Sequence, residues 1–268
     1  MDKAAPDPLQ VVRNRIDSID AEMHRLLIER SGVVAELIRI KGTSKPGAAF
    51  RPDREADMMR RMAQRHEGGL PLATVEHIWR EIIATFTAMQ APFGVVVGPA
   101  ADVLAMRDAV RFYFGFSVPI ETAATGKAAV ERVAASQQDL AVIAADAKER
   151  WWGGLAGADA PKVFAKLPFI EVPDRPAALP AYVLGPPLKD PLAPDIRLVA
   201  AKDAPGLADA FQAFGGVIAA RTDGDVLVEL PVAATLDDVA GAAGSALAEV
   251  RDIGGFCQPI RFVAERVA

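Results

Sequence analysis

Residues 11–41 most constrain what this chain can fold into, because they read as one long helix with no proline inside it. Apolar residues recur there at the three- and four-residue spacing of a buried helix face. They are Ile16, Ile19, Met23, Leu26, Leu27, Val33, Val34, Leu37 and Ile38. Such a helix spans about 45 Å, and the two helical patterns that follow it are shorter. Three helices of such unequal length do not close into a compact monomeric bundle, so we expect an intertwined helical homodimer.

Three cations lie on or beside this apolar face, namely Arg13, Arg30 and Lys41. A charge in such a position is costly unless it meets an opposite charge or a ligand. Arg30 and Lys41 are separated by about 16 Å along the helix axis, so their long side chains can converge on one small anion. Arg13 is about 26 Å from Arg30, too far to reach the same molecule from a straight helix. We therefore expect Arg13 to serve the second site of a symmetric dimer.

Two further helices are expected, at residues 52–66 and 72–90, after a loop at residues 42–49. Pro52 suits a first-turn position at the start of the former. Asp53 and Glu55 follow it near the positive end of the helix dipole. The apolar side of the latter helix is predicted to comprise Val75, Ile78, Trp79, Ile82, Ile83, Phe86 and Met89.

Residues 9–90 resemble the all-helical chorismate mutase domain, in the version found at the N-terminus of bifunctional chorismate mutase–prephenate dehydratases. The resemblance is carried by Arg13-Asn14-Arg15-Ile16-Asp17 with Asp20, Glu29-Arg30, Lys41, Phe50-Arg51-Pro52-Asp53-Arg54-Glu55, Trp79-Arg80-Glu81-Ile82-Ile83 and Gln90. It implies an isomerase of the shikimate pathway that converts chorismate to prephenate for aromatic amino acid biosynthesis.

The resemblance also implies a role for each site residue. Arg30 and the partner chain's Arg13 would bind the substrate carboxylates, because guanidinium groups match carboxylates with two parallel hydrogen bonds. Lys41 and Gln90 would donate to the ether oxygen, which gains negative charge in the transition state. Glu55 would accept from the ring hydroxyl. The rearrangement is unimolecular, so no cofactor and no metal is expected.

Three nearby residues carry no assigned role. Arg51 and Phe86 stand where some members of the family have an acidic residue and a small hydroxyl residue. Arg54 either supports the site or pairs with Glu55.

Residues 92–190 alternate between strand and helix patterns, which predicts a small α/β lobe. Gly98-Pro99 and Tyr113-Phe114-Gly115 resemble the opening of the prephenate dehydratase domain, and the runs at residues 140–144 and 181–185 resemble its closing part. The middle of that domain is missing, as is the Thr-Arg-Phe segment expected before the last strand. We therefore expect a truncated lobe without dehydratase activity.

Residues 195–268 follow a proline-rich linker and show the order β-α-β-β-α-β, with the second helix at residues 236–248. This order resembles the amino-acid-binding (ACT-like) regulatory module that ends the same bifunctional enzymes, and Gly206 would allow close approach of an amino-acid ligand. Two interpretations stay open: an aromatic amino acid sensor, or a degenerate module that serves stability or dimer contacts. The fold expected is thus multidomain, α and α+β, with a helical domain at 1–91.

Composition limits the remaining functions. The formal net charge of −5 argues against a nucleic-acid partner, which needs a basic surface. Cys257 is the only cysteine, and His24, His66 and His77 lack metal-ligand spacing. No segment resembles a membrane span or a signal peptide, so we expect a cytoplasmic protein. Two alternatives to a mutase remain: an isochorismate-pyruvate lyase and an inert regulatory subunit.

Overall fold

The computed structural model describes residues 7–41, 50–136, 138–188, 193–222, 224–243 and 249–262. The expected loop at 42–49, part of the proline-rich linker and the expected helical residues 244–248 lie outside these ranges. The chain divides into two compact units, Met1–Ser44 and Lys45–Ala268. Among the described helices, none combines the length and the apolar character that a membrane crossing requires.

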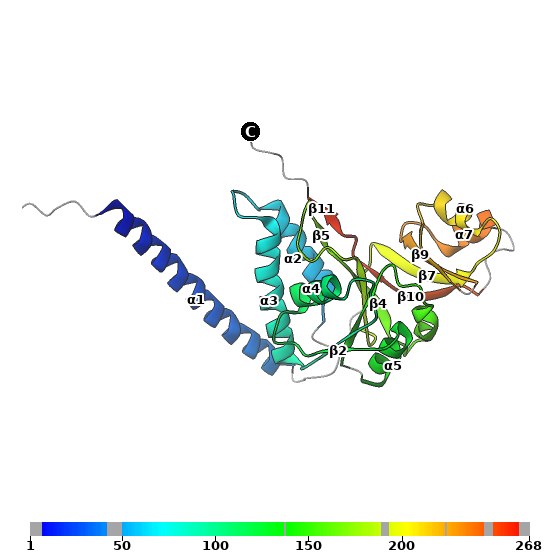
Figure 1. Ribbon diagram of the computed structural model, residues 1–268, viewed down its shortest axis with the longest axis horizontal. Coiled ribbons are helices and arrows are strands. Elements are labelled where there is room, and N and C mark those ends of the chain that lie inside the picture. The colour runs from blue at the N-terminus through cyan, green and yellow to red at the C-terminus, as the bar shows by residue number, and fades with distance from the viewer. Residues whose placement is uncertain are drawn as a thin grey trace, which may run out of the picture. The chain divides into compact units, whose positions relative to one another are not determined.

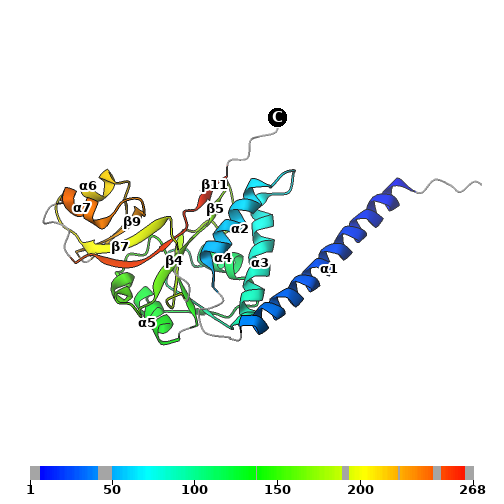
Figure 2. The same ribbon diagram turned by 180° about the vertical axis from the view of Figure 1, so that it is seen from behind.

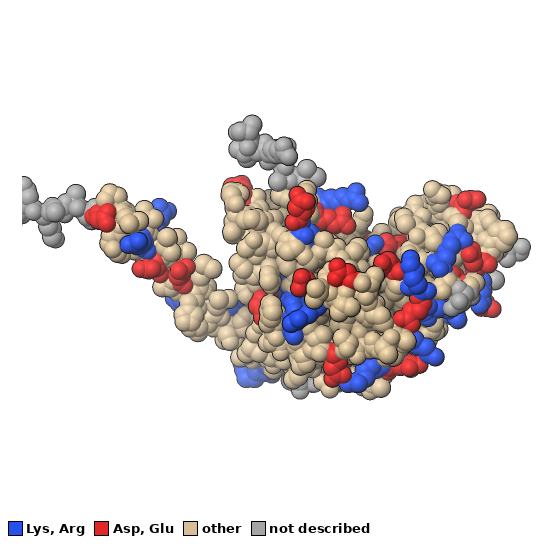
Figure 3. Space-filling view, in the orientation of Figure 1, with Lys and Arg blue, Asp and Glu red and all other residues tan. Residues whose placement is uncertain are grey.

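The first unit holds one continuous helix, α1 (Pro8–Lys41), which confirms the predicted helix and begins three residues before its predicted start (Figure 1). Asp7 precedes it, and its side-chain Oδ1 accepts a hydrogen bond from the Leu9 N–H at 3.2 Å. The apolar stripe of α1 is left about half exposed: Ile16 and Ile19 are each 51% exposed and Met23 is 52% exposed. Figure 3 shows charged side chains scattered among uncharged residues along α1. The helix therefore carries apolar side chains that it does not itself bury.

The second unit begins with two helices, α2 (Pro52–Gln64) and α3 (Leu72–Gln90). Pro52 occupies the first turn of α2, and the bounds of α3 agree with those predicted. The predicted buried side of α3 is wrong in part, because Ile78 and Met89 are 42% and 54% exposed. Glu76 and Arg80 are buried instead, since α3 packs against α4 (Val103–Phe114), and partners for both charges are at hand on that side.

A nine-stranded sheet forms the centre of the second unit, in the order β2-β1-β3-β6-β4-β10-β7-β9-β8. Its strands are β1 (Val95–Val97), β2 (Ile120–Thr122), β3 (Leu140–Ala144), β4 (Lys162–Leu167), β6 (Ala181–Gly185), β7 (Ile196–Lys202), β8 (Val217–Thr222), β9 (Asp225–Pro231) and β10 (Arg251–Phe256). Strands β2, β1 and β3 are parallel, and β6 is antiparallel to β3. A separate pair joins β5 (Ile170–Glu171) to β11 (Ile260–Arg261).

Helices cover both faces of the β1–β3 part of the sheet (Figure 2). Alternate residues of a strand point to opposite faces, so Val95 and Val97 join the core shared with α2, α3 and α4. Val96 joins the opposite core, against α5 (Gly126–Ser136) and the 3₁₀ helix η1 (Trp151–Leu155). The helical region of residues 50–90 is thereby packed onto one face of the α/β region.

The last third of the chain confirms the predicted β-α-β-β-α-β order, as β7, α6 (Leu207–Ala213), β8, β9, α7 (Leu236–Ala243) and β10. Strand β10 also pairs in parallel with β4, so one sheet runs through both predicted α/β ranges. Gly254 makes this approach, with φ +124°, and a Cβ there would overlap the Val163 backbone. The helical, α/β and β-α-β-β-α-β regions confirm the fold class, and the domain boundaries stay a prediction.

Candidate active site

Three of the predicted site residues lie on α1. Arg13 and Arg30 are exposed on this continuous helix, so the axial separations expected from the sequence apply to them. Lys41 is the last residue of α1, and only its backbone is described. These three residues belong to the unit Met1–Ser44, whereas Glu55 and Gln90 belong to Lys45–Ala268.

Glu55 lies in the first turn of α2, and its side chain is 28% exposed. Arg80 of α3 donates to it through Nη1, at 3.2 Å from Glu55 Oε2. Burial raises the pKa of Glu55, the charge of Arg80 opposes this rise, and the nearby carboxylate of Asp53 adds to it. Arg54, which the sequence left as a candidate partner of Glu55, is exposed.

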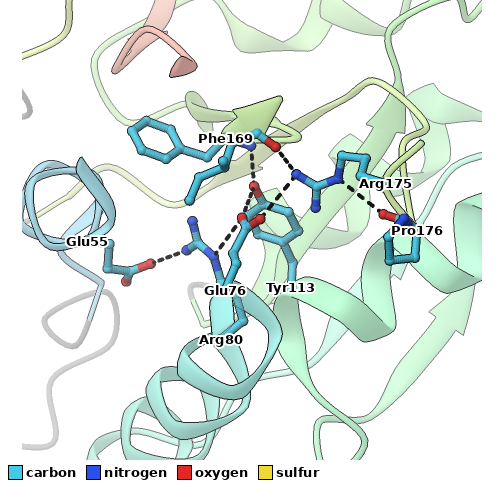
Figure 4. A network of polar contacts seen from close by, with 8 residues as sticks. Glu55, Glu76, Arg80, Tyr113, Phe169, Arg175 and Pro176 are labelled. Atoms are coloured by element: carbon cyan, nitrogen blue, oxygen red, sulfur yellow. Dashed lines mark hydrogen bonds and ion pairs between the residues drawn. The ribbon is translucent and has the colours of Figure 1, made fainter. Parts of the chain in front are cut away.

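Arg80 also faces a second carboxylate, because its Nε lies 3.8 Å from Oε1 of Glu76. Glu76 is fully buried and lies 3.1 Å, through Oε2, from Nη1 of Arg175. Figure 4 shows the resulting chain of alternating charges, from Glu55 through Arg80 and Glu76 to Arg175. Two carboxylates and two guanidinium groups balance to zero net charge, which is the condition under which buried charges are tolerated.

Hydrogen bonds from α4 and from the loops around β5 complete this charged chain. The Tyr113 hydroxyl donates to Glu76 Oε1 at 3.3 Å and accepts from the Phe169 backbone N–H. Arg175 donates through Nε to the Pro176 carbonyl at 3.1 Å, and through Nη1 to the Ile170 carbonyl. Burial raises the pKa of both Tyr113 and Glu76, although Arg80 opposes the rise in each case.

A cavity of about 70 Å³ adjoins the Glu55–Arg80 pair. Its walls are mostly apolar, from α2, α3, α4, β3, β4 and β6 and their neighbouring loops. Ligand pockets usually enclose roughly 300–1,000 Å³. The unit Lys45–Ala268 therefore surrounds Glu55 with a space that holds a few waters rather than a ring compound.

Gln90 closes α3 and does not line this cavity. Its side-chain Nε2 donates to the carbonyl of Phe86 at 3.1 Å. Phe86 itself is buried, with 9% of its area exposed. Arg51 is the residue before the first turn of α2 and is half-buried.

Sequence reasoning missed the roles of Glu76, Arg80, Tyr113 and Arg175. One signal was present, because Glu76 and Arg80 are four residues apart and so share a helix face. Arg80 stood inside a stretch that carried the family resemblance, yet no partner for it was identified. Arg175 comes from a loop far along the chain and had no local signal.

A family model described as chorismate mutase type II matches residues 12–91. The resemblance predicted from the sequence is confirmed over these residues, which include Arg13, Arg30, Lys41, Glu55 and Gln90. The match to the chorismate mutase type II class thus covers about the N-terminal third of the chain.

Curated relatives are named as bifunctional chorismate mutase/prephenate dehydratases. The protein from Neisseria gonorrhoeae is 39% identical over 88 residues, which are 32% of this chain and 24% of that protein. The protein from Stutzerimonas stutzeri is 32% identical over 117 residues, 42% of this chain and 32% of that protein. The chain thus spans about a quarter to a third of the length of these relatives.

Solved structures with a likeness to this chain include a prephenate dehydratase from Arthrobacter aurescens in complex with L-Phe. It has a TM-score of 0.40 and 12% identity, over 62% of this chain and 90% of that one. A prephenate dehydratase from Streptococcus mutans has a TM-score of 0.37 and 11% identity, over 63% and 99% of the two chains.

Proposed function

We propose that this protein is a chorismate mutase, which rearranges chorismate to prephenate. The observation that carries the proposal is the match of residues 12–91 to chorismate mutase type II. The residues that we assign to the site come from three helices: Arg13, Arg30 and Lys41 from α1, Glu55 from α2 and Gln90 from α3. The substrate is a dianion, and the chain has a formal net charge of −5. A local cluster of cations must therefore hold the substrate against the overall field.

Arg30 and a second copy's Arg13 bind the two carboxylates and hold the flexible side arm of the substrate over its ring. Lys41 and Gln90 donate to the ether oxygen as its bond to carbon breaks. A glutamine amide has two N–H groups, so Gln90 can keep its bond to the Phe86 carbonyl and still donate to substrate. Glu55 accepts from the ring hydroxyl while Arg80 neutralises it.

The proposal includes a homodimer built on α1. The half-exposed stripe of Ile16, Ile19 and Met23 is an unfavourable surface for a helix in water. A second copy of the chain offers the same stripe, and a two-fold axis would pair the two. The arrangement also brings Arg13 of one copy to the site of the other.

We further propose that the protein has no prephenate dehydratase activity. Strand β6 is preceded by Leu179-Pro180 rather than by a Thr-Arg-Phe segment. The same protein preparation can be assayed for phenylpyruvate release from prephenate, which we expect to be absent.

An aromatic amino acid is the effector that we propose for the β-α-β-β-α-β region. Gly206 precedes α6 in a left-handed conformation, with φ +82°, and among the described residues, its chain neighbours aside, no heavy atom lies within 4 Å of the position of a Cβ there. The loop before α6 therefore leaves its backbone open to a ligand. Chorismate turnover measured with and without phenylalanine, tyrosine and tryptophan tests this proposal.

The decisive experiment is to follow chorismate and isochorismate consumption separately, with the wild type, Arg30→Ala and Arg25→Ala. Arg30→Ala should lower turnover of chorismate by roughly 10²-fold or more, because it removes the proposed partner of a substrate carboxylate, and losing one member of a desolvated charge pair is costly. Arg25 is the matched control, since it is on α1 but pairs at 2.7 Å and 2.8 Å with Glu22 and Glu29. We expect Arg25→Ala to retain turnover.

The outcomes separate the alternatives. Prephenate from chorismate, lost in Arg30→Ala, supports the mutase. Pyruvate from isochorismate without prephenate from chorismate identifies a lyase instead. A wild-type protein that turns over neither compound contradicts both enzymes and leaves an amino-acid-binding subunit.

A further inference from the structure

The charged chain that ends at Glu55 begins outside the residues matched to the mutase family. Its members Tyr113 and Arg175 belong to α4 and to the loop after β5, beyond residue 91. Arg175 is 8% exposed and Arg80 is 5% exposed, so both guanidinium groups are withdrawn from solvent. A buried guanidinium group that bridges two carboxylates, as Arg80 does between Glu55 and Glu76, fixes the positions of both.

Arg80 is held on three sides. Its Nη1 donates to Glu55 at 3.2 Å, its Nε lies 3.8 Å from Glu76, and its Cζ lies 4.3 Å from the centre of the Tyr113 ring. The last contact is a cation–π interaction, which restricts the guanidinium plane further. Figure 4 shows Arg80 between the two carboxylates, with Tyr113 beside it. A side chain restrained in this way holds Glu55 in one place.

We propose that Arg80 is a positioning residue for the mutase reaction: it keeps the Glu55 carboxylate ionised and oriented, and Glu76 and Arg175 hold Arg80 in turn. The inference rests on the proposed role of Glu55 in binding the substrate hydroxyl. It adds that the α/β region, through Tyr113 and Arg175, is part of the machinery that sets the mutase site. Residues 12–91 alone then lack two of the five members, Tyr113 and Arg175.

The electrostatic setting explains why Glu55 needs this support. Burial raises the pKa of Glu55, and the positive charge of Arg80 opposes that rise. The charged or titratable groups around Glu55 are Asp53 on α2, Arg80 and Glu76 on α3, Tyr113 on α4, Lys166 on β4 and Cys257 after β10. Lys166 is paired with Glu229 at 2.7 Å, whereas Arg80 donates directly to Glu55 at 3.2 Å.

Loss of Arg80 and loss of Glu76 should act on Glu55 in opposite directions. Arg80→Gln removes the stabilising cation, so the pKa of Glu55 rises by about one to three units. Glu76→Gln removes the carboxylate that competes for Arg80, so the pKa of Glu55 falls. A merely structural role for the charged chain predicts lower stability in both variants, without opposite shifts.

The test uses the full chain with carbon-13 in its glutamate carboxyl groups. The Glu55 resonance is the one lost in Glu55→Gln, and its titration midpoint is compared among the wild type, Arg80→Gln, Arg80→Lys and Glu76→Gln. The same proteins are assayed for kcat/KM with chorismate across the acid and neutral range. Arg132→Gln is the control, because Arg132 forms an exposed ion pair with Glu121 at 2.5 Å, away from this chain of charges.

We expect the midpoint and the acid limb of kcat/KM to move up together in Arg80→Gln, with activity recovering at higher pH. Both should move down in Glu76→Gln and stay near the wild type in Arg80→Lys and Arg132→Gln. When Glu55 is already replaced by glutamine, adding Arg80→Gln should not shift the acid limb of the kcat/KM profile, because the titrating carboxyl group is gone. If Arg80→Gln does not fold, Glu76→Gln still tests the proposal, because the pKa of Glu55 should fall in that variant.

An unchanged Glu55 midpoint in Arg80→Gln or in Glu76→Gln overturns the proposal. An acid limb that moves equally without Glu55 overturns it too. The resonance reports on Glu55 whether or not the protein turns over chorismate. A shifted midpoint in a protein without mutase activity would therefore contradict the proposed function and leave the control of Glu55 by Arg80 standing.

Discussion

Helices α1 and α3 differ in which kinds of side chain they bury. α1 leaves apolar side chains such as Ile16 and Ile19 half exposed, whereas α3 buries the charged side chains of Glu76 and Arg80. Exposed apolar area is unfavourable in water, and a buried charge is unfavourable without a partner. The charges of α3 have their partners in the Lys45–Ala268 unit. In the proposed dimer, a second chain would cover the apolar face of α1.

The two helices therefore differ in the source of the contacts that surround them. The environment of α3 follows from contacts within one chain, through Tyr113 and Arg175. In the proposed dimer, the environment of α1 would follow from assembly, because its stripe has the spacing of a helix–helix interface. Two substitutions test these two statements, and a third examines another buried charge, in order from the largest expected effect.

Ile19→Asp places a charge in the centre of the α1 stripe. We expect complete loss of the dimer and of mutase turnover, because a desolvated carboxylate is incompatible with an apolar interface. Light scattering after size-exclusion chromatography measures the assembly. Ser18→Asp is the control, since residue 18 lies about 200° around the helix from Ile16. A dimer that survives Ile19→Asp would break the contrast, as α1 would then need no apolar partner.

Arg175→Met tests the buried side of the contrast. Removing this cation leaves Glu76 with one partner fewer, and breaking a buried pair costs about 3–5 kcal/mol. Urea unfolding measures the change in the free energy of unfolding. Arg261→Met removes an ion pair with Glu171 in which the arginine side chain is 85% exposed, and it should cost less than about 1 kcal/mol. Equal losses in the two variants would show that burial does not matter to this ion pair.

Asp225→Asn examines a buried charge outside these two helices. We expect a smaller effect, seen in the pH dependence of stability. Burial opposes the ionisation of Asp225, but bonds from Lys202 and Arg251 and the charge of Arg150 lower its pKa overall. A carboxyl group with a lowered pKa in the folded state stabilises the protein above its unfolded pKa of about 3.9. That contribution is lost as the pH falls through the folded pKa.

Thermal unfolding of Asp225→Asn across a series of acidic buffers checks this sign. The variant should be less stable than the wild type near neutral pH and should lose less stability on acidification. Asp209→Asn, at an exposed position on α6, is the control and should follow the wild type. Parallel curves for Asp225→Asn and the wild type would contradict the assignment.

Local patterns predicted much of this fold. The bounds of α3, β3 and β6 agree with the sequence expectations, because periodicity and flanking Gly or Pro residues are local signals. The pairing of β10 with β4 was missed, since it joins segments far apart in the chain. Strand β4 itself was missed along with η1, β5 and β11.

The candidate site divides in the same way. Arg13, Arg30, Lys41, Glu55 and Gln90 were identified from spacing and family resemblance, and their roles stay predictions. The link between Glu55 and Arg80 was missed, because whether a charge is buried depends on which segments pack against it. Arg175 reaches Glu76 from a loop that has no periodic pattern of its own.

The close approach of Gly254 to Val163 has a practical consequence for shortened versions of this protein. Strand β10 supplies the neighbour of β4 on the side opposite β6. A chain cut in the proline-rich linker would leave one border of β4 with bare amide and carbonyl groups, and such borders recruit strands from other molecules. The carboxyl-terminal third therefore also prevents aggregation of the preceding α/β region. Fragments that lack this third should aggregate on expression.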